Sequence, residues 1–163
     1  MIDRQGNLKK DIRLGEGTAY HSAGIDYDGQ NVWVPAAEYR PNSRAIVYTV
    51  DPKTYRVTER FPVTDHVGGV VRDRTTGQVH GVSWGSRTLY NWTPTSRQLQ
   101  SVPNESHLLD YQNCDSVARG KQLCGVLRGV HLVYGSPPPT DRPKSLGLPA
   151  HVKVVTASLD SSG

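Results

Sequence analysis

Three histidines recur at similar intervals along the chain, and imidazole is the side chain best suited to binding a transition metal. His21, His66 and His107 are 45 and 41 residues apart. If a repeated fold brings the three rings to one axis, they predict a metal site, with a divalent ion as its cofactor. The alternative is that each ring hydrogen-bonds to neighbouring strand and turn groups, since a repeated position also follows from a repeated structural role. Under that alternative no cofactor is expected.

A second candidate site is formed by charged residues in two loops. Glu38 is an acceptor, whereas Arg40 and Arg44 are planar donors suited to carboxylate or phosphate. The corresponding loop one repeat later begins at Trp84 and carries Arg87. Together the loops predict an anion-binding mouth, at which a small-molecule or protein ligand would bind. The alternative is a structural ion pair between Glu38 and an arginine.

Asp110 and Gln112 extend the metal and ligand hypotheses. A strand is expected over Leu108–Asn113, and strand alternation would place both side chains on the same face. If that face looks into a central channel, Asp110 joins His107 there as a metal candidate and Gln112 becomes a ligand-binding candidate.

Two cysteines, Cys114 and Cys124, are ten residues apart. A hairpin would bring them close enough for a disulfide. The alternative is a pair of small buried thiols, and the spacing does not fit a zinc site.

An internal repeat must position all these residues. The segment Ile46–Val57 returns as Thr88–Leu99, with an offset of 42 residues. Short stretches alternate apolar and polar residues at the strand period, and glycines and prolines separate them. A β-rich period of about 40–50 residues is typical of propeller blades. The predicted fold class is therefore all-β, of the β-propeller type.

The repeat predicts a partial propeller of about three blades over residues 1–135, with units at about 21–65, 66–106 and 107–135. The expected strands are Gly24–Asp28, Val32–Ala36, Ala45–Asp51, Arg56–Val63, Gly69–Asp73, Val79–Trp84, Thr88–Trp92, Gln98–Pro103, Leu108–Asn113 and Gln122–Leu127. Residues 136–163 are expected to form an irregular Pro-rich tail, with one further strand over His151–Thr156.

Three blades are too few to close a ring, since propellers usually have 4–8. We therefore expect the chain to be a piece of a longer protein. The alternatives are an oligomer that completes the ring and an open twisted stack. Open blade edges would also allow self-association.

Composition excludes several classes of function. There are 19 Lys and Arg residues against 15 acids, but the bases are scattered, so no nucleic-acid partner is expected. No apolar run is long enough for a membrane span, and the polar N-terminus predicts no signal peptide, although full-length relatives could be secreted. Neither a nucleophile elbow nor a phosphate-binding glycine loop is present.

Four strings of residues carry a family resemblance: Gly24–Gly29, Trp33–Ser43, His80–Arg87 and Asp110–Cys114. They resemble an uncharacterised family of bacterial and fungal proteins that are predicted β-propellers, described only as a domain of unknown function. The resemblance covers about residues 3–124. It implies further blades before position 1 and after about 125, and it implies a fold without an activity.

The sequence therefore predicts a ligand-binding or scaffold module without catalysis, whose channel mouth presents His, Arg and Glu side chains. The first alternative is a metal-dependent, lactonase-like hydrolase, by analogy of fold alone. Its site would draw on His21, His66, His107, Glu38 and Asp110. The second alternative is a truncated product with no activity of its own.

Overall fold

The computed structural model of the protein describes residues 1–95, 98–105, 110–119, 121–126 and 129–134. Two features expected from the sequence lie outside these residues. They are His107 and the tail over 136–163, including the strand expected at His151–Thr156.

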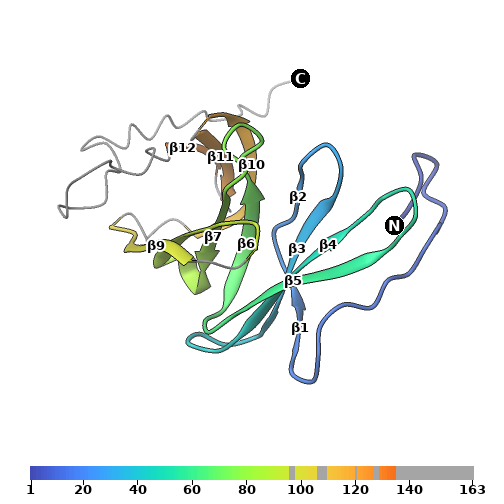
Figure 1. The fold of residues 1–163 in the computed structure, drawn as a ribbon, viewed down its shortest axis with the longest axis horizontal. Coiled ribbons are helices and arrows are strands. Elements are labelled where there is room, and N and C mark those ends of the chain that lie inside the picture. The colour runs from blue at the N-terminus through green and yellow to red at the C-terminus, as the bar shows by residue number, and fades with distance from the viewer. Residues whose placement is uncertain (96–97, 106–109, 120, 127–128, 135–163) are drawn as a thin grey trace.

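The described residues form three antiparallel sheets (Figure 1). Sheet 1 contains β1 (Ala19–Ser22), β2 (Asp26–Tyr27), β3 (Val32–Glu38), β4 (Ala45–Val50) and β5 (Val57–Val63). Sheet 2 contains β6 (Val67–Arg72), β7 (Val79–Ser83), β8 (Thr88–Trp92) and β9 (Gln98–Pro103), with a short 3-10 turn, η1 (Trp84–Ser86), after β7. Sheet 3 contains β10 (Tyr111–Ala118), β11 (Lys121–Val126) and β12 (Gly129–Tyr134).

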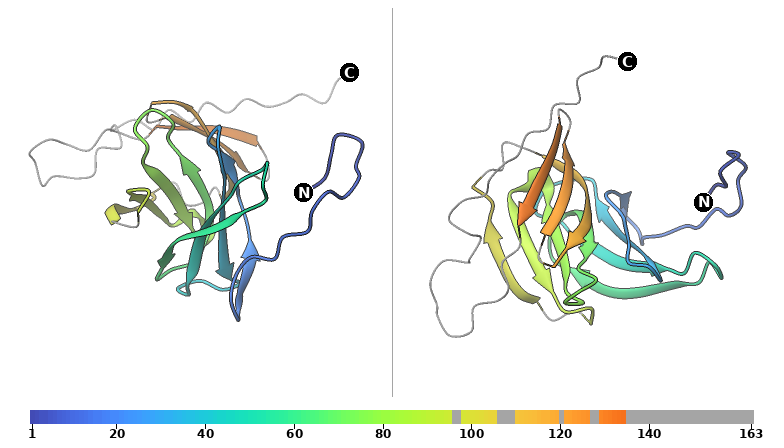
Figure 2. Two further views of the ribbon diagram at one scale, coloured as in Figure 1. Left: turned by 45° about the vertical axis from the view of Figure 1, so that its right-hand side comes forward. Right: turned by 90° about the horizontal axis from the view of Figure 1, so that it is seen from above.

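The three sheets lie side by side, and the N-terminal segment runs along the side of sheet 1 that is away from sheet 2 (Figure 2).

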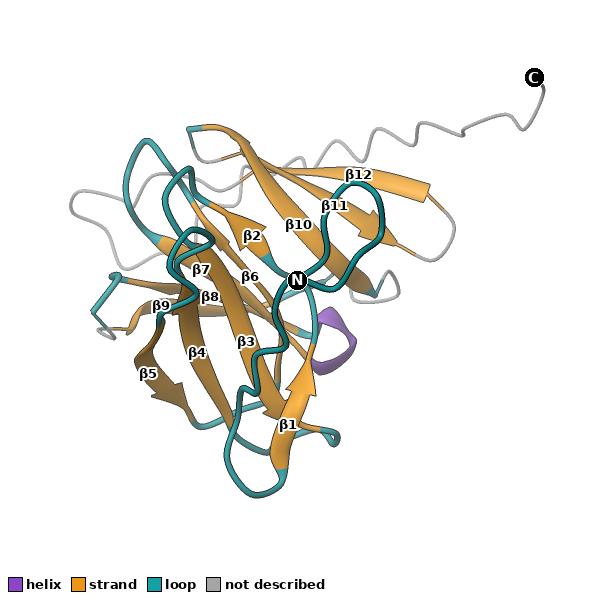
Figure 3. Ribbon diagram, turned by 90° about the vertical axis from the view of Figure 1, so that its right-hand side faces the viewer, coloured by secondary structure: helices purple, strands orange, loops and turns teal. Residues whose placement is uncertain are grey.

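The first inner strand differs from its prediction. The expected strand Gly24–Asp28 is replaced by β1 and β2, which follow one another along β3 (Figure 3). Between them Gly24 turns to sheet 2, where its N–H donates to Gly68 O (2.9 Å) and its carbonyl accepts from Val70 N (3.3 Å). The backbone thus joins two sheets directly.

An apolar core lies between sheets 1 and 2. Its buried residues are Trp33, Ala37, Ala45, Val47, Phe61, Val63, Val67, Val70, Val79 and Trp92. The Trp92 ring needs a glycine beneath it: a Cβ on Gly81 would lie 2.7 Å from Trp92 Cη2 and even closer to Cζ3. The strand alternation read from the sequence produces this core, because every second residue of β3 and β4 faces sheet 2.

Three hairpin turns are closed in the same way by an aspartate. The Oδ1 atoms of Asp28, Asp51 and Asp73 each accept hydrogen bonds from the backbone N–H groups two and three residues later. This is the turn geometry for which aspartate is favoured.

Sheet 3 packs on sheet 2 through a small apolar cluster that contains both cysteines. Cys114 on β10 pairs directly with Cys124 on β11, and the two form a disulfide. Both are buried with Tyr111 against Val71 and Val82 of sheet 2. The strand expected to begin at Leu108 is described only from Tyr111, so Asp110 precedes β10 rather than lying on it. Asp110 therefore lies outside the strand that carries Gln112, whereas the alternation argument placed both on it.

Candidate functional site

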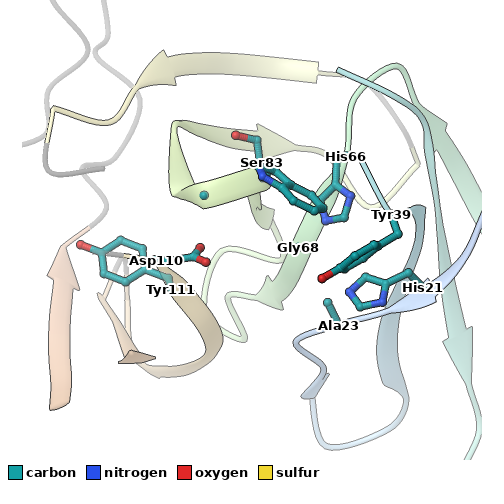
Figure 4. Close-up of a pocket in the computed structure, with 10 residues that line it drawn as sticks. His21, Ala23, Tyr39, His66, Gly68, Ser83, Asp110 and Tyr111 are labelled. Carbon is teal, nitrogen blue, oxygen red and sulfur yellow. The ribbon is translucent and has the colours of Figure 1, made fainter. Parts of the chain in front are cut away.

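A cavity of about 150 Å³ lies where the three sheets meet, beside η1. Figure 4 shows residues from β1, η1 and the start of β10 around it. The lining residues are His21, Ala23, Tyr39, His66, Gly68, Ser83, Trp84, Gly85, Asp110 and Tyr111. The site therefore depends on the packing of separate repeats.

Four aromatic side chains on one side of this cavity form a closed circuit of ring contacts. His21 packs on Tyr39 with ring centroids 4.8 Å apart, and Tyr39 packs on Trp84 at 5.2 Å. Trp84 packs on His66 at 4.8 Å, and His66 lies 6.0 Å from His21. The first three contacts are edge-to-face, the arrangement that aromatic rings favour. The rings hold one another in place, which fixes the shape of this wall.

The two nitrogens of His66 have different roles. The ring is buried, and Nδ1 lies 2.7 Å from Glu38 O at the end of β3. A carbonyl oxygen only accepts, so Nδ1 carries the proton and Nε2 of the neutral ring carries the lone pair. Nε2 lies over Gly68, 3.7 Å from the position of a Cβ there, and faces the cavity. His66 thus has the structural hydrogen bond considered from the sequence and also an acceptor in the pocket.

The structure brings together three of the four metal candidates, while His107 lies outside the described residues. His21, His66 and Asp110 all line the cavity. Asp110 approaches from the opposite side, with its carboxylate turned toward Gly68 (Figure 4). Within the described ranges no three His, Cys, Asp or Glu side chains are close enough together to share a metal ion.

The expected anion-binding loop is held by its own ion pairs. Arg40 donates to Glu38 Oε2 through Nε at 2.8 Å, and Arg44 Nε lies 3.7 Å from Oε1. Thr18 Oγ1 also donates to Oε1, at 2.8 Å. The Thr18 hydrogen bond, with the charges of Arg40 and Arg44, holds the pKa of the Glu38 carboxyl below its usual range. Both arginines therefore have a carboxylate partner outside the cavity.

The other ligand-binding candidates lie in different surroundings. Trp84 lines the cavity. Arg87 is exposed and is not among the lining residues, but its Nε lies 3.7 Å from where a Cβ on Gly85 would be. Gln112 lies on β10, and its side chain is outside the described part of the structure.

Comparison with known proteins gives the family. The profile of one protein family matches residues 1–134, most of the chain. The chain belongs to the family of unknown function DUF6454. A search of curated proteins found no match to this DUF6454 chain.

Solved structures show the fold of the DUF6454 chain. The β-propeller domain of Myceliophteria thermophila Cps50 (Swd1) is 13% identical with a TM-score of 0.50; the match covers 81% of this chain and 39% of that one. A chain of a nidogen/laminin complex is also 13% identical with a TM-score of 0.50, over 68% of this chain and 42% of that one. The all-β, propeller-type fold is confirmed, and the chain spans about two fifths of each matched structure.

Sequence reasoning missed several lining residues of the DUF6454 pocket, although one signal was present. The 45-residue interval that maps His21 onto His66 also maps Tyr39 onto Trp84. Tyr39 directly follows β3 and Trp84 directly follows β7, and both join the ring circuit. The same interval also maps Ala23 onto Gly68, two small residues that line the cavity by leaving space open. No described helix of the DUF6454 chain is long and apolar enough to cross a bilayer.

Proposed function

We propose that this chain is a ligand-binding module of propeller type, and that its ligand occupies the cavity between the three sheets. The observation that carries the proposal is the aromatic circuit of His21, Tyr39, Trp84 and His66 beside a cavity of about 150 Å³. A cavity of about this volume accepts a guest the size of benzene. Ligand sites combine apolar and aromatic walls with a few polar groups, as this one does.

Binding of a neutral, ring-sized probe tests this proposal. Benzyl alcohol should bind at millimolar concentration in ligand-observed NMR. Gly68→Ala should weaken it by about fivefold or more, because the added methyl takes up space in the cavity. The new Cβ would make only ordinary contacts, 3.7 Å from His66 Nε2 and 3.8 Å from the Val82 and Ser83 carbonyl oxygens, so the variant should fold.

Gly125→Ala is the matched control, since its Cβ would lie 3.9 Å from Asn113 O on sheet 3 and Gly125 is not among the lining residues. It should bind the probe as the wild type does. The proposal fails if no ring-sized probe binds, or if both glycine variants bind equally to wild type.

A divalent-metal site is the second candidate, and one observation favours it. Metal-ligating histidines commonly donate the other ring N–H to a carbonyl, as His66 does to Glu38 O. Two imidazoles supply fewer ligands than a usual zinc site. If the metal proposal holds, Zn²⁺ should bind with micromolar or tighter affinity. Either His21→Ala or His66→Ala should weaken this affinity by about tenfold or more. Equal binding by these variants and wild type would contradict it.

A further inference from the structure

We propose that the ligand of the cavity is a neutral ring compound with a hydroxyl group, and that this hydroxyl donates a hydrogen bond to His66 Nε2. This inference deepens the proposed function and rests on it. The feature that carries it is a buried acceptor in the cavity wall.

His66 is a buried side chain with one polar atom left unpaired. Its exposed fraction is 3%, and its Nδ1–H donates to Glu38 O at 2.7 Å. None of the described residues donates to Nε2, which faces the cavity over Gly68. A ligand that enters the cavity displaces water, and an acceptor that is then left without a donor costs affinity. A ligand that donates to Nε2 is therefore favoured over one that only fills the space.

The same wall also contains donors. Tyr39 turns its hydroxyl into the cavity (Figure 4), and no described residue forms a hydrogen bond with that hydroxyl. Trp84 and His21 each add a ring N–H. An ammonium group, which only donates, would leave these donors unmatched. A hydroxyl suits both kinds of group, because its hydrogen donates to Nε2 while its oxygen accepts from a donor beside it.

The rest of the wall favours a neutral, apolar body. The edge-to-face rings and the small residues Ala23 and Gly68 enclose a cavity of about 150 Å³, the size of a single ring. No lysine or arginine is among the residues that line it. A carboxylate ligand would find no cationic side chain there, and its oxygens would face the lone pair of His66 Nε2.

Two isomeric probes isolate the hydroxyl hydrogen. Benzyl alcohol and anisole contain the same atoms and both have an oxygen that accepts, but only the alcohol donates. The ratio of the anisole Kd to the benzyl alcohol Kd is measured in the presence of a chelator, which keeps metal ions off the imidazoles. In His66→Asn the amide N–H can replace Nδ1–H opposite Glu38 O, whereas nothing replaces Nε2. This variant should lower the ratio by about fivefold, the usual net contribution of one hydrogen bond.

Two matched controls come from the same ring circuit. His21→Asn removes the other imidazole and leaves His66 in place. Tyr39→Phe keeps the ring and removes a donor that the oxygen of either probe can use. Both variants should keep the wild-type ratio. A ratio that is unchanged in His66→Asn, or that falls as far in either control, would overturn the inference.

The wild-type protein gives a second readout that needs no variant to fold. Acceptance of a hydrogen bond moves the ¹⁵N resonance of an unprotonated imidazole nitrogen upfield. The His66 Nε2 resonance should therefore lie further upfield in the benzyl alcohol complex than in the anisole complex. If both probes bind and the two complexes give the same resonance, the hydroxyl inference is wrong while the proposed function stands. Failure of both probes to bind contradicts both proposals.

Discussion

Replacing Asp28 by asparagine should lower the free energy of unfolding by about 3 kcal/mol at pH 7. The carboxylate is almost fully buried and joins sheets 1 and 2. Its Oδ2 accepts from Trp33 Nε1 at 2.7 Å and from Arg72 Nη1 at 2.8 Å, while Oδ1 closes the turn after β2. Asparagine at position 28 would turn its NH₂ group toward N–H donors such as Trp33 Nε1. It would also remove the carboxylate that pairs with Arg72. Chemical denaturation measures the loss.

The pH dependence of the Asp28 effect has a definite sign. Burial alone would raise the pKa of Asp28, but hydrogen bonds from Asn31 N, Trp33, Gln30 N and Arg72 outweigh it and lower the pKa to about 2, from 3.8. A depressed folded pKa means that the stabilisation is present above about pH 4 and is lost as the pH falls toward 2. The difference between wild type and Asp28→Asn should shrink over that range.

Asp26, two residues earlier, is the matched control, and its substitution should have the opposite sign. Its Oδ2 accepts from Arg72 N at 2.9 Å, but its buried Oδ1 has no hydrogen-bond partner in the structure. Burial raises the pKa of this carboxyl. A raised pKa means that its contribution is favourable in acid and is lost as the pH rises. Asp26→Asn should therefore stabilise the protein at pH 7. Equal effects of the two substitutions would contradict this account of the junction.

Removal of the disulfide should cost about 2–3 kcal/mol of unfolding free energy, the effect of opening a loop of about ten residues. Cys114 and Cys124 also pack in the small cluster between sheets 2 and 3. We expect a reducing agent to lower the denaturation midpoint of the wild type. In the double variant Cys114→Ala, Cys124→Ala the denaturation midpoint should be lower than that of the wild type even without reducing agent.

The double variant also provides the control, because reducing agent should leave its midpoint unchanged. Hydrogen exchange should show the loss of protection first in β10 and β11, where the cross-link lies. A wild-type midpoint that does not respond to reducing agent would show that the cross-link makes no contribution to stability.

The parts of the fold that follow local patterns could be predicted from the sequence. Strand alternation located β8 and β9 at their observed bounds, and the other strands of the first two units, apart from the first inner strand, within about two residues. That inner strand was missed because its break depends on Gly24 pairing with another sheet, which no local pattern records. Asp110 was placed on a strand for a similar reason, since the start of β10 is fixed by a contact: Tyr111 N donates to Ser86 Oγ in η1.

For the candidate site, the sequence predicted that His21 and His66 would lie near one another, but it did not predict the hydrogen bonds and ion pairs around them. The repeat gathers His21 and His66 at one end of the sheets, as expected for residues at equivalent positions. The sequence could not say that Glu38 would be held by Arg40 and Arg44 from its own loop. Nor could it distinguish the two nitrogens of His66, because the carbonyl that selects between them belongs to the preceding sheet.

Imidazole ¹⁵N NMR during a titration with benzyl alcohol is the most direct test of the central claim, that a ligand occupies the cavity beside His66. We predict that His66 is protonated at Nδ1 and bare at Nε2 in the free protein, and that its Nε2 resonance shifts as the probe saturates. A proton on Nε2 in the neutral ring, or a His66 spectrum unchanged at saturating probe, would contradict the account.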